Sequence, residues 1–274
     1  HYPLRRQRQM CIRDSYYMKK FALVDLKGGL GNQIFQISFA NFLKNLGFNV
    51  FLDTTFFYSN HKFPRKLEVD LRELGFNKTK LKSNFFFRLN KSLFWEDDSF
   101  EMEDLKFYNR FVGYYQNFKY LENSKFFLKD KLNLISNNQN NNVVALHMRR
   151  TDYKIINQML TDTYYEKAIN ELLTNNNDLQ FDIFTDDVNV KLDKKIFKNI
   201  RNIYKPIPNE NSIDVLRKML NYKYYITANS SFSSIAAFLS EIDNKIVIYP
   251  DPWWRNSEIK LINIPSDWIG IQNN

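Results

Sequence analysis

Residues 143–153 read VVALHMRRTDY, and this stretch decides how the rest of the sequence is interpreted. The apolar run at 143–146 predicts a buried strand. An imidazole, two guanidinium groups and a carboxylate follow within about one turn, at His147, Arg149, Arg150 and Asp152. Ligands of parallel α/β proteins bind where strands end, and paired arginines suit anionic ligands. The stretch therefore predicts an anion site in an α/β enzyme, with an ordinary charged surface loop as the alternative.

A strand–turn–helix–strand unit is predicted near the N-terminus. Apolar residues at 21–26 and 48–53 predict two strands, and an apolar stripe over 34–46 predicts a helix between them. The glycine-rich turn at 27–33 would let the backbone approach a ligand closely. It lacks the Gly-Lys-Ser/Thr of a phosphate-binding loop, and Ile34 replaces the third glycine of the dinucleotide fingerprint. The sequence therefore gives little support to a nicotinamide cofactor.

Strands and helices alternate in the C-terminal half. The predicted strands are 143–146, 181–184, 224–227 and 245–249, and the predicted helices are 163–173, 213–220 and 235–239. Thr163 with Glu166 forms a capping-box pattern, and Ser212 is a second predicted N-cap. Each strand ends in a polar or aromatic cluster. Because such ends share one edge of a parallel sheet, this pattern predicts a ligand site at that edge.

The sequence also predicts two domains. Residues 136–142 are rich in asparagine and lack hydrophobic periodicity, which is typical of an interdomain linker. We expect an N-terminal domain at 18–140 and a C-terminal domain at 141–274, which the family resemblance described below implies to be the acceptor-side and the donor-binding domain. Residues 1–17 have no apolar periodicity and precede a natural start at Met18. We therefore expect 1–17 to be extraneous to the fold.

Composition excludes several classes of chemistry. Cys11 is the only cysteine and the chain has three histidines, which argues against disulfides, a thiol nucleophile and Cys- or His-rich metal sites. The sequence has no apolar run of membrane-spanning length and no signal peptide, so we expect a cytoplasmic protein. The net charge of +9 suits nucleotide phosphates or an anionic membrane surface. Nucleic-acid binding is the alternative, but no basic block or known motif supports it.

Two sets of residues could hold a diphosphate. Arg149 and Arg150 offer planar forks for phosphate oxygens, and the serine-rich turn at 230–234 opens a helix with free backbone N–H groups. No two aspartates are separated by one residue, so the Asp-x-Asp signature of metal-dependent sugar-nucleotide transferases is absent. Asp186 is interpreted either as a ligand contact or as a helix cap or partner of Arg150. These features favour a metal-free transferase that uses a nucleotide sugar.

Five ordered motifs carry a family resemblance. They are Gly28-Gly29-Leu30-Gly31-Asn32-Gln33, Gly113-Tyr114-Tyr115-Gln116, His147-x-Arg149-Arg150-x-Asp152-Tyr153, Phe184-Thr185-Asp186-Asp187 and Asn229-Ser230-Ser231-Phe232-Ser233. The set resembles the bacterial α-1,2-fucosyltransferases of glycosyltransferase family 11. This resemblance implies a GT-B fold, in which two Rossmann-like α/β domains face each other across a cleft. It also implies GDP-β-L-fucose as the co-substrate, inversion at the anomeric carbon and no metal cofactor.

The resemblance implies a donor site. Arg149 would contact the β-phosphate and steady the departing GDP, and His147 would lie against the nucleotide. Asp214 would accept hydrogen bonds from guanine. The full expected set is His147, Arg149, Arg150, Asp186, Asp214, Asn229, Ser230, Ser231, Phe232 and Ser233.

The resemblance also implies an acceptor side, formed by Gly31, Asn32, Gln33, Tyr115, Gln116, Trp253 and Trp254. Asn32 would orient the acceptor hydroxyl or the fucose. Asp152 is the candidate general base, and the alternatives are that it orients Arg150 or that a phosphate oxygen or water takes the proton. The chain departs from the family pattern at Ser234-Ile235, where the family often has Trp-Trp.

The expected acceptor is a galactose-terminated oligosaccharide or lipid-linked glycan, such as one of bacterial lipopolysaccharide O-antigen. The product would carry an α-1,2 linkage to a β-galactoside. Membrane contact would be at most peripheral, at the inner membrane. The alternatives are an inactive GDP-sugar or glycan-binding protein on the same fold, and a fucosyltransferase of another linkage.

Overall fold

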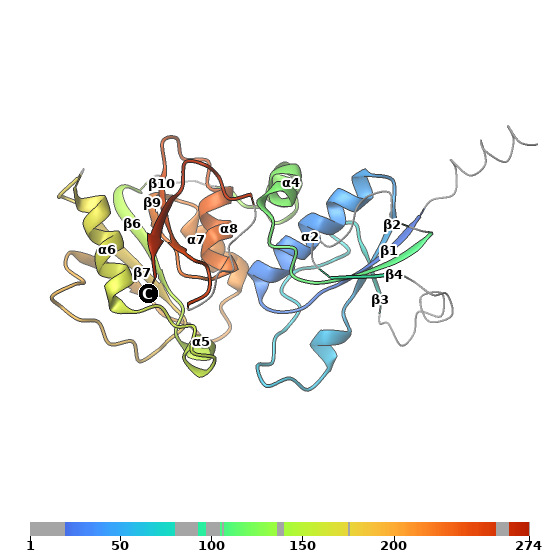
Figure 1. Cartoon of the computed structure of the whole chain (residues 1–274), viewed down its shortest axis with the longest axis horizontal. Helices are drawn as coiled ribbons and strands as arrows, with labels where there is room; N and C mark the ends of the chain where they lie inside the picture. The colour runs from blue at the N-terminus through green and yellow to red at the C-terminus, as the bar shows by residue number, and fades with distance from the viewer. Residues whose placement is uncertain are drawn as a thin grey trace, which may run out of the picture.

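The computed structural model describes residues 20–79, 93–96, 105, 107–135, 140–174, 176–255 and 263–273, with residues 93–96 described by their backbone. These residues form two parallel β-sheets with helices packed beside them, and Figure 1 shows the two units next to each other. This arrangement confirms the expected fold class of two Rossmann-like α/β units. The tail at 1–17 lies outside the described residues.

The first sheet has the strand order β3-β2-β1-β5-β4, and every pair in it is parallel. Its strands are β1 (Phe21–Asp25), β2 (Asn49–Asp53), β3 (Asn77–Thr79), β4 (Leu93–Glu96) and β5 (Tyr108–Val112). Helix α2 (Leu30–Asn45) connects β1 to β2, the short 3-10 helix η1 (Thr55–Tyr58) follows β2, and α4 (Phe118–Lys131) follows β5. The predicted strand–turn–helix–strand unit is therefore confirmed.

The second sheet has the order β11-β10-β9-β6-β7-β8 and is also parallel. Its strands are β6 (Asn140–Met148), β7 (Gln180–Thr185), β8 (Ile200–Tyr204), β9 (Tyr222–Ile226), β10 (Ile246–Asp251) and β11 (Ile269–Gln272). The helices of this unit are α5 (Thr151–Ile155), α6 (Asp162–Leu173), α7 (Ser212–Met219) and α8 (Ser231–Leu239). All four predicted strands are present, and β8 and β11 are additional.

Several predicted boundaries were wrong for local reasons. Helix α2 begins at Leu30 because Gly28, at φ +81°, ends the turn in a conformation that favours glycine. Asn211 rather than Ser212 caps α7, since its side-chain oxygen accepts from the Ile213 N–H at 3.1 Å. Helix α6 begins at Asp162, so the pattern at Thr163 lies inside its first turn.

The predicted linker was also placed wrongly in part. Residues 136–139 lie outside the described part of the chain, and residues 140–142 begin strand β6. The side chain of Asn140 donates to the Asn221 carbonyl at 3.1 Å, which ties this strand start to the residue just before β9. The proposed domain boundary near residue 140 stays a prediction.

Apolar packing continues from one sheet unit to the other. A single cluster of buried side chains includes residues of α2, α4 and α8. Phe118 on α4 lies 5.6 Å from Phe35 on α2, and 5.3 Å from both Phe238 on α8 and Trp268, between ring centroids. Aromatic pairs at such distances add to the free energy of burial. We infer that this core fixes how the two units face each other.

A buried carboxylate joins three strands of the second sheet. Asp182 on β7 is 0% exposed and accepts hydrogen bonds from Arg201 on β8 at 2.9 Å and from the Tyr222 hydroxyl on β9 at 2.6 Å. Asn202 donates to the same carboxylate at 3.0 Å. Burial alone would raise the pKa of Asp182, but the hydrogen bonds from Arg201, Tyr222 and Asn202 outweigh it and lower the pKa below its ordinary value.

Replacing Asp182 by asparagine is expected to destabilise the fold by about 3 kcal/mol, because it leaves Arg201 without its buried partner. Urea unfolding would measure this, with the exposed Asp178→Asn as the matched control, expected to change stability by less than about 0.5 kcal/mol. Since the pKa of Asp182 is lowered on folding, its stabilisation is present above the ordinary carboxyl pKa and is lost as pH falls through the native value. The two proteins should therefore converge in stability in strong acid. Equal stability at neutral pH would contradict this role.

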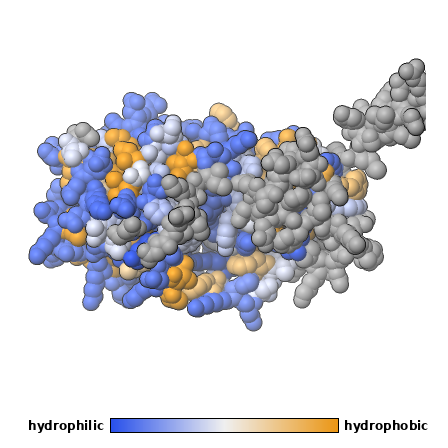
Figure 2. All heavy atoms as spheres, viewed as in Figure 1, coloured by the Kyte–Doolittle hydropathy of each residue, from blue (hydrophilic) through white to orange (hydrophobic). Residues whose placement is uncertain are grey.

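Among the described residues, no helix combines the length and hydrophobicity that crossing a bilayer requires. Figure 2 shows a face that is mostly hydrophilic, with apolar patches of limited extent. Peripheral contact with the inner membrane therefore stays a prediction.

Candidate functional site

A cavity of about 940 Å³ lies where the two sheet units meet. Its volume is in the range of ligand pockets in proteins. In the second sheet it opens between β6 and β9, where the chain order reverses, and Arg149 and Ser231 follow these two strands. In the first sheet the same reversal falls between β1 and β5, which are followed by Asn32 and Gln116. Ligands of open α/β sheets bind at such switch points, so both units present their binding edge to one cavity.

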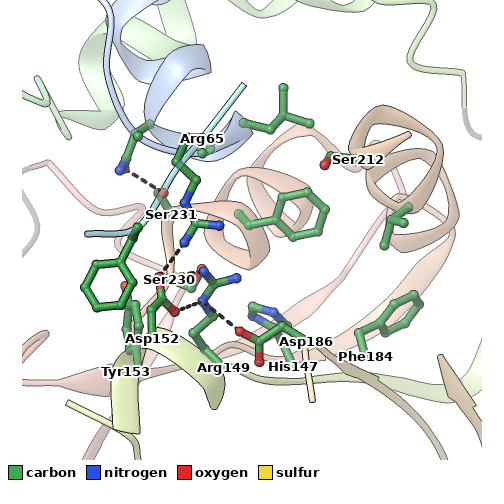
Figure 3. Close-up of a pocket in the computed structure, with 18 of the residues that line it drawn as sticks. Arg65, His147, Arg149, Asp152, Tyr153, Phe184, Asp186, Ser212, Ser230 and Ser231 are labelled. Carbon is green, nitrogen blue, oxygen red and sulfur yellow. Dashed lines mark hydrogen bonds and ion pairs between the residues drawn. The ribbon is translucent and has the colours of Figure 1, made fainter. Parts of the chain in front are cut away.

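Arg149 projects into this cavity and is held by two carboxylates, as Figure 3 shows. Its Nε and Nη2 donate to the two oxygens of Asp152, both at 2.9 Å, and Nε lies 3.2 Å from Asp186 Oδ2. In the described part of the chain no acceptor is found for Nη1, so two N–H groups of the guanidinium stay available to a ligand. Burial opposes the charge, but the hydrogen bonds with Asp152 and the charge of Asp186 outweigh it and raise the pKa of Arg149.

Asp186 also caps the short helix α5. Its Oδ1 accepts from the Arg150 backbone N–H at 2.7 Å, and its Oδ2 accepts from the Thr151 hydroxyl at 2.5 Å. The helix-cap interpretation of Asp186 is therefore supported by these contacts, and it is Arg149 rather than Arg150 whose side chain pairs with it. Asp186 lines the cavity as well, so a contact with ligand stays a prediction.

His147 lies at the end of β6, beside Arg149, and is 5% exposed. Burial lowers the pKa of His147 to about 4, although the charge of Asp186 acts in the opposite direction. The imidazole is therefore neutral at neutral pH. Its Nδ1 is buried and has no hydrogen-bond partner among the residues that the structure describes, and its ring lies 6.0 Å from that of Phe232. His147 also lines the cavity, so a neutral ring and not a cation faces a ligand there.

Two helix N-termini meet at the cavity. The N-cap of α2 is Gly29, which has no side chain, and the N-cap Ser230 of α8 makes no side-chain capping bond. The first backbone N–H groups of both helices and the helix dipoles therefore favour an anion at this point. The helices approach so closely that a Cβ on Gly31 would lie 2.6 Å from the Phe232 backbone nitrogen. The Ser231 hydroxyl donates to Asn32 Oδ1 at 2.8 Å. The two units therefore touch directly at the site.

Asn32 is further fixed by Gln116, whose Nε2 donates to Asn32 Oδ1 at 2.8 Å. Because that oxygen accepts two hydrogen bonds, the amide orientation is set and its N–H₂ group points elsewhere. An asparagine so fixed can position a hydroxyl group but cannot remove its proton at neutral pH.

Arg65 adds a second guanidinium, which comes from the first unit. Its Nη2 donates to Asp152 Oδ2 at 2.5 Å, and Figure 3 shows Arg65 and Arg149 reaching the same carboxylate. Burial raises the pKa of Asp152, but the hydrogen bond and charge of Arg149 and the charge of Arg65 prevail, so the pKa is lowered. A carboxylate held in this way is a weak base. The structure thus shows Asp152 as the bridge between the units, and it orients Arg149 rather than Arg150.

The opposite end of the cavity has an aromatic and apolar lining. Phe184 at the end of β7 stacks on Tyr204 at the end of β8, with 4.6 Å between ring centroids. Val215 and Lys218 of α7 line the same end, and Lys218 donates to Glu210 at 2.6 Å. Phe184 is 2% exposed, so the apolar surface available to a planar ring system comes from its neighbours, such as Tyr204 and Val215.

The structure brings most of the predicted site residues to this cavity. Those that line it are Gly31, Asn32, Gln116, His147, Arg149, Asp152, Asp186, Ser230, Ser231, Phe232, Trp253 and Trp254. Trp253 is 2% exposed, and Trp254 stacks on Tyr153 with ring centroids 5.7 Å apart. The Tyr153 hydroxyl donates to the Asn229 carbonyl at 2.9 Å, which fixes this aromatic wall.

The predicted donor contacts Arg150, Asp214 and Asn229 do not line the cavity. Arg150 pairs with Asp162 at 3.1 Å. Asp214 is exposed and pairs with Arg217 at 2.6 Å. Adjacent residues of a strand end or helix point in different directions, which explains why these two lie away from the cavity, and their contact with the donor stays a prediction. Asn229 is 0% exposed, and its side chain donates to the Gln158 carbonyl at 2.8 Å. This hydrogen bond ties the turn before α8 to the segment that follows α5.

Three further residues proved to be structural. The Ser233 hydroxyl donates to the Ser230 carbonyl at 3.2 Å, because it lies on the buried face of α8. Tyr115 is 0% exposed and stacks on Phe39 at 3.9 Å, so its neighbour Tyr114 lines the cavity instead. Gln33 is also buried at 0% and holds the 66–68 segment by hydrogen bonds.

Sequence reasoning missed Arg65, Glu68 and the whole aromatic end of the cavity. Arg65 and Glu68 lie in a connection without periodicity, where no sequence signal places them at the site. One sequence pattern could have indicated the aromatic end. Strand β8 ends at Tyr204 and is followed by Lys205, so an aromatic and a polar residue stand at its end, as they do at the ends of the predicted strands. That strand is short and was not predicted. Within the described residues, no group of three or more His, Cys, Asp or Glu is placed to hold a metal ion.

The sequence is similar to that of a known protein family and of two curated proteins. The family model described as Glycosyl transferase family 11 matches residues 7–272. An α-1,2-colitosyltransferase of Escherichia coli is 31% identical over 181 residues, which cover 59% of this chain and 62% of that protein. The O-antigen biosynthesis glycosyltransferase WbnK of Escherichia coli is 31% identical over 142 residues, covering 48% of this chain and 46% of that protein. The chain thus spans less than two thirds of either relative.

Among solved structures, the crystal structure of NodZ α-1,6-fucosyltransferase co-crystallized with GDP is similar to this chain at 12% sequence identity. The match covers 80% of this chain and 91% of that chain, with a TM-score of 0.41.

Proposed function

Because the chain belongs to glycosyl transferase family 11, we propose that it transfers L-fucose from GDP-β-L-fucose to a β-galactoside hydroxyl of a glycan. The reaction would form an α-1,2 linkage with inversion and without a metal ion. The observation that carries the proposal is Arg149, which projects into the cavity between the two units. Asp152 and Asp186 fix two of its nitrogens, and its Nη1 group has no acceptor among the described residues. The Arg149 guanidinium can stabilise the negative charge of the leaving diphosphate in the role that a metal ion has in metal-dependent transferases.

The chemistry follows from where charge develops. As the bond between fucose C1 and the β-phosphate oxygen breaks, negative charge grows on GDP. Arg149 and the N-termini of α2 and α8 are held in place before the reaction, so they can stabilise that charge without reorganising. Such interactions strengthen in the transition state and therefore raise turnover rather than only binding.

The aromatic end of the cavity is the proposed nucleobase site. Tyr204, backed by the buried Phe184 that stacks on it, supplies aromatic surface there, and Ser212 and Glu210 add polar groups. The diphosphate would then extend past His147 to Arg149 and Ser231. This places the sugar near Asn32, at the point where both units meet.

The proposed acceptor side lies beside Trp253, Trp254 and Asn32. Aromatic rings pack well against the apolar faces of sugars, and the acceptor would be a galactose-terminated or lipid-linked glycan. The relative named as an O-antigen biosynthesis glycosyltransferase supports an acceptor of that kind, handled in the cytoplasm with at most peripheral contact at the inner membrane.

The name of the other relative favours a second candidate sugar. An α-1,2-colitosyltransferase supports the α-1,2 linkage and adds colitose as an alternative to fucose on the donor. A comparison of GDP-fucose with GDP-colitose at equal concentration would separate the two by their kcat/KM values.

The test is an assay of GDP release and product linkage with GDP-fucose and a panel of β-galactosides, with and without EDTA. We expect acceptor-dependent GDP release that EDTA does not change, and an α-1,2-linked product by linkage analysis. GDP binding without turnover on any sugar nucleotide would support the inactive binding protein instead. A rate that EDTA abolishes and Mg²⁺ or Mn²⁺ restores would contradict metal independence.

A further inference from the structure

We infer that Glu68 is the catalytic residue that removes the proton from the acceptor hydroxyl. This inference rests on the proposed function. Neither Arg149 nor Asn32 can remove the proton of the acceptor hydroxyl, so the reaction needs another group for that step. An inverting displacement needs a proton acceptor on the face of the sugar opposite to the leaving group. Glu68 comes from the first unit, whereas Arg149, which would hold the leaving group, comes from the second.

Among the described residues four carboxylates line the cavity, and three of them already have strong partners within the protein. Asp152 is bound by Arg149 and Arg65, Asp186 by Arg149 and helix α5, and Glu210 by Lys218. Each of these would have to break strong hydrogen bonds before it could accept a proton. Glu68 is the fourth. Within the described residues its carboxylate accepts no hydrogen bond, and its nearest cation is Lys66, at 3.8 Å.

The surroundings of this carboxylate favour a hydroxyl ligand. The Glu68 side chain is only 11% exposed, and its Oε2 atom is buried without a hydrogen-bond partner in the described structure. A buried carboxylate oxygen without a donor is energetically costly, and such groups in native proteins commonly mark a functional site. Since the side chain as a whole lines the cavity, a sugar hydroxyl there would donate to the part of the carboxylate that the cavity reaches, and Oε2 would stay covered.

Glu68 is held to helix α2 by hydrogen bonds with a buried glutamine. Its backbone N–H donates to Gln33 Oε1 at 2.9 Å, and Gln33 Nε2 donates to the Lys66 carbonyl at 2.9 Å and to the Gly28 carbonyl at 3.0 Å. Gln33 lies in the first turn of α2, one residue after Asn32. The buried glutamine therefore ties the 66–68 segment to the helix turn that carries Asn32. This gives the sequence motif residue Gln33 a positioning role.

The proposed step forms one bond, breaks one bond and moves one proton. An oxygen lone pair of the acceptor hydroxyl forms the new bond to fucose C1, and the bond from C1 to the β-phosphate oxygen breaks. Its electron pair leaves on GDP, next to Arg149. The hydroxyl proton passes to the Glu68 carboxylate, which returns it to water after the products depart.

The direct test replaces Glu68 by glutamine and measures kcat, KM for the acceptor, and GDP affinity. We expect kcat to fall by about 10²–10⁴-fold, the range for loss of a general base, with GDP affinity unchanged within about twofold. The exposed Glu73 provides a matched control, and Glu73→Gln should leave kcat unchanged. A Glu68→Gln variant that binds GDP normally and turns over within threefold of wild type would overturn the inference.

A second variant separates proton removal from a structural role. Azide attacks C1 without having a proton to lose, so Glu68→Ala should form fucosyl azide and release GDP at least ten times faster than it transfers to the glycan. If Glu68→Ala binds GDP normally but azide gives no acceleration, Glu68 is not the base. These outcomes are distinct from failure of the proposed function, in which wild type itself would transfer no sugar.

Discussion

Replacing Arg149 by lysine is expected to lower kcat by about 10²–10³-fold, the usual effect of removing one preorganised donor to a developing oxyanion. Lysine keeps the positive charge but loses the planar fork that meets Asp152 at two points, both at 2.9 Å, while leaving Nη1 for a ligand. Arg149→Ala should lose at least as much. The measurement is steady-state GDP release with saturating donor and acceptor.

The neighbouring arginine provides the matched control. Arg150 pairs with Asp162 at 3.1 Å and its guanidinium does not line the cavity. Arg150→Lys should therefore keep kcat within a few-fold of wild type. Near-normal turnover in Arg149→Lys, or an equal loss in both variants, would contradict the assignment of the leaving-group contact to Arg149.

Gly31→Ala is expected to lower kcat by about 10²-fold, because misplacing reacting groups by about 1 Å costs that much. A Cβ at this position would lie 2.6 Å from the Phe232 nitrogen and 2.7 Å from the Ser231 carbonyl carbon. These are backbone atoms, so α2 and α8 would have to move apart. The donor and acceptor sides of the cavity would then lose their alignment.

Gly29→Ala separates helix displacement from the addition of a methyl group, since a Cβ on Gly29 meets no other described atom within 4 Å. Its backbone is extended, at φ −80°, which alanine adopts without strain. Because Gly29 also lines the cavity, we expect Gly29→Ala to lose some activity but less than Gly31→Ala, and Gly31→Ala to retain its thermal unfolding midpoint within a few degrees. Full activity in Gly31→Ala would show that the helix contact does not set the geometry of the site.

The sequence was most informative where strands end. Hydrophobic runs located β1, β2, β6, β7, β9 and β10, and the rules of parallel sheets then gathered Arg149, Asp186 and Ser231 at one edge. Helix starts were less predictable. They depend on which of several adjacent polar residues caps the helix, as Asn211 does in place of Ser212.

Directions of individual side chains could not be derived from motif membership. Arg149 and Arg150 are adjacent in one motif, yet one faces the cavity and the other faces Asp162. Ser231 faces Asn32, whereas Ser233, two residues on, lies on the buried face of α8. A family motif therefore combines residues that contact ligand with residues that hold the motif in shape, and only the three-dimensional arrangement separates them.

The contribution of the first unit was the least predictable part of the site. Arg65 and Glu68 lie in the connection between η1 and β3, which has no strand or helix pattern of its own. Their positions are set by long-range contacts, with Asp152 for Arg65 and Gln33 for Glu68. Such contacts between residues distant in sequence leave no periodic signal.

The most direct measurement of the central claim compares the affinities of GDP and GMP by calorimetry in buffer with EDTA. If Arg149 contacts the β-phosphate, wild type should bind GDP at least about tenfold more tightly than GMP, since a charged hydrogen bond contributes about 1.5–3 kcal/mol. Arg149→Ala should bind both with similar affinity. If the variant keeps the full preference for GDP, the proposed role of Arg149 is contradicted.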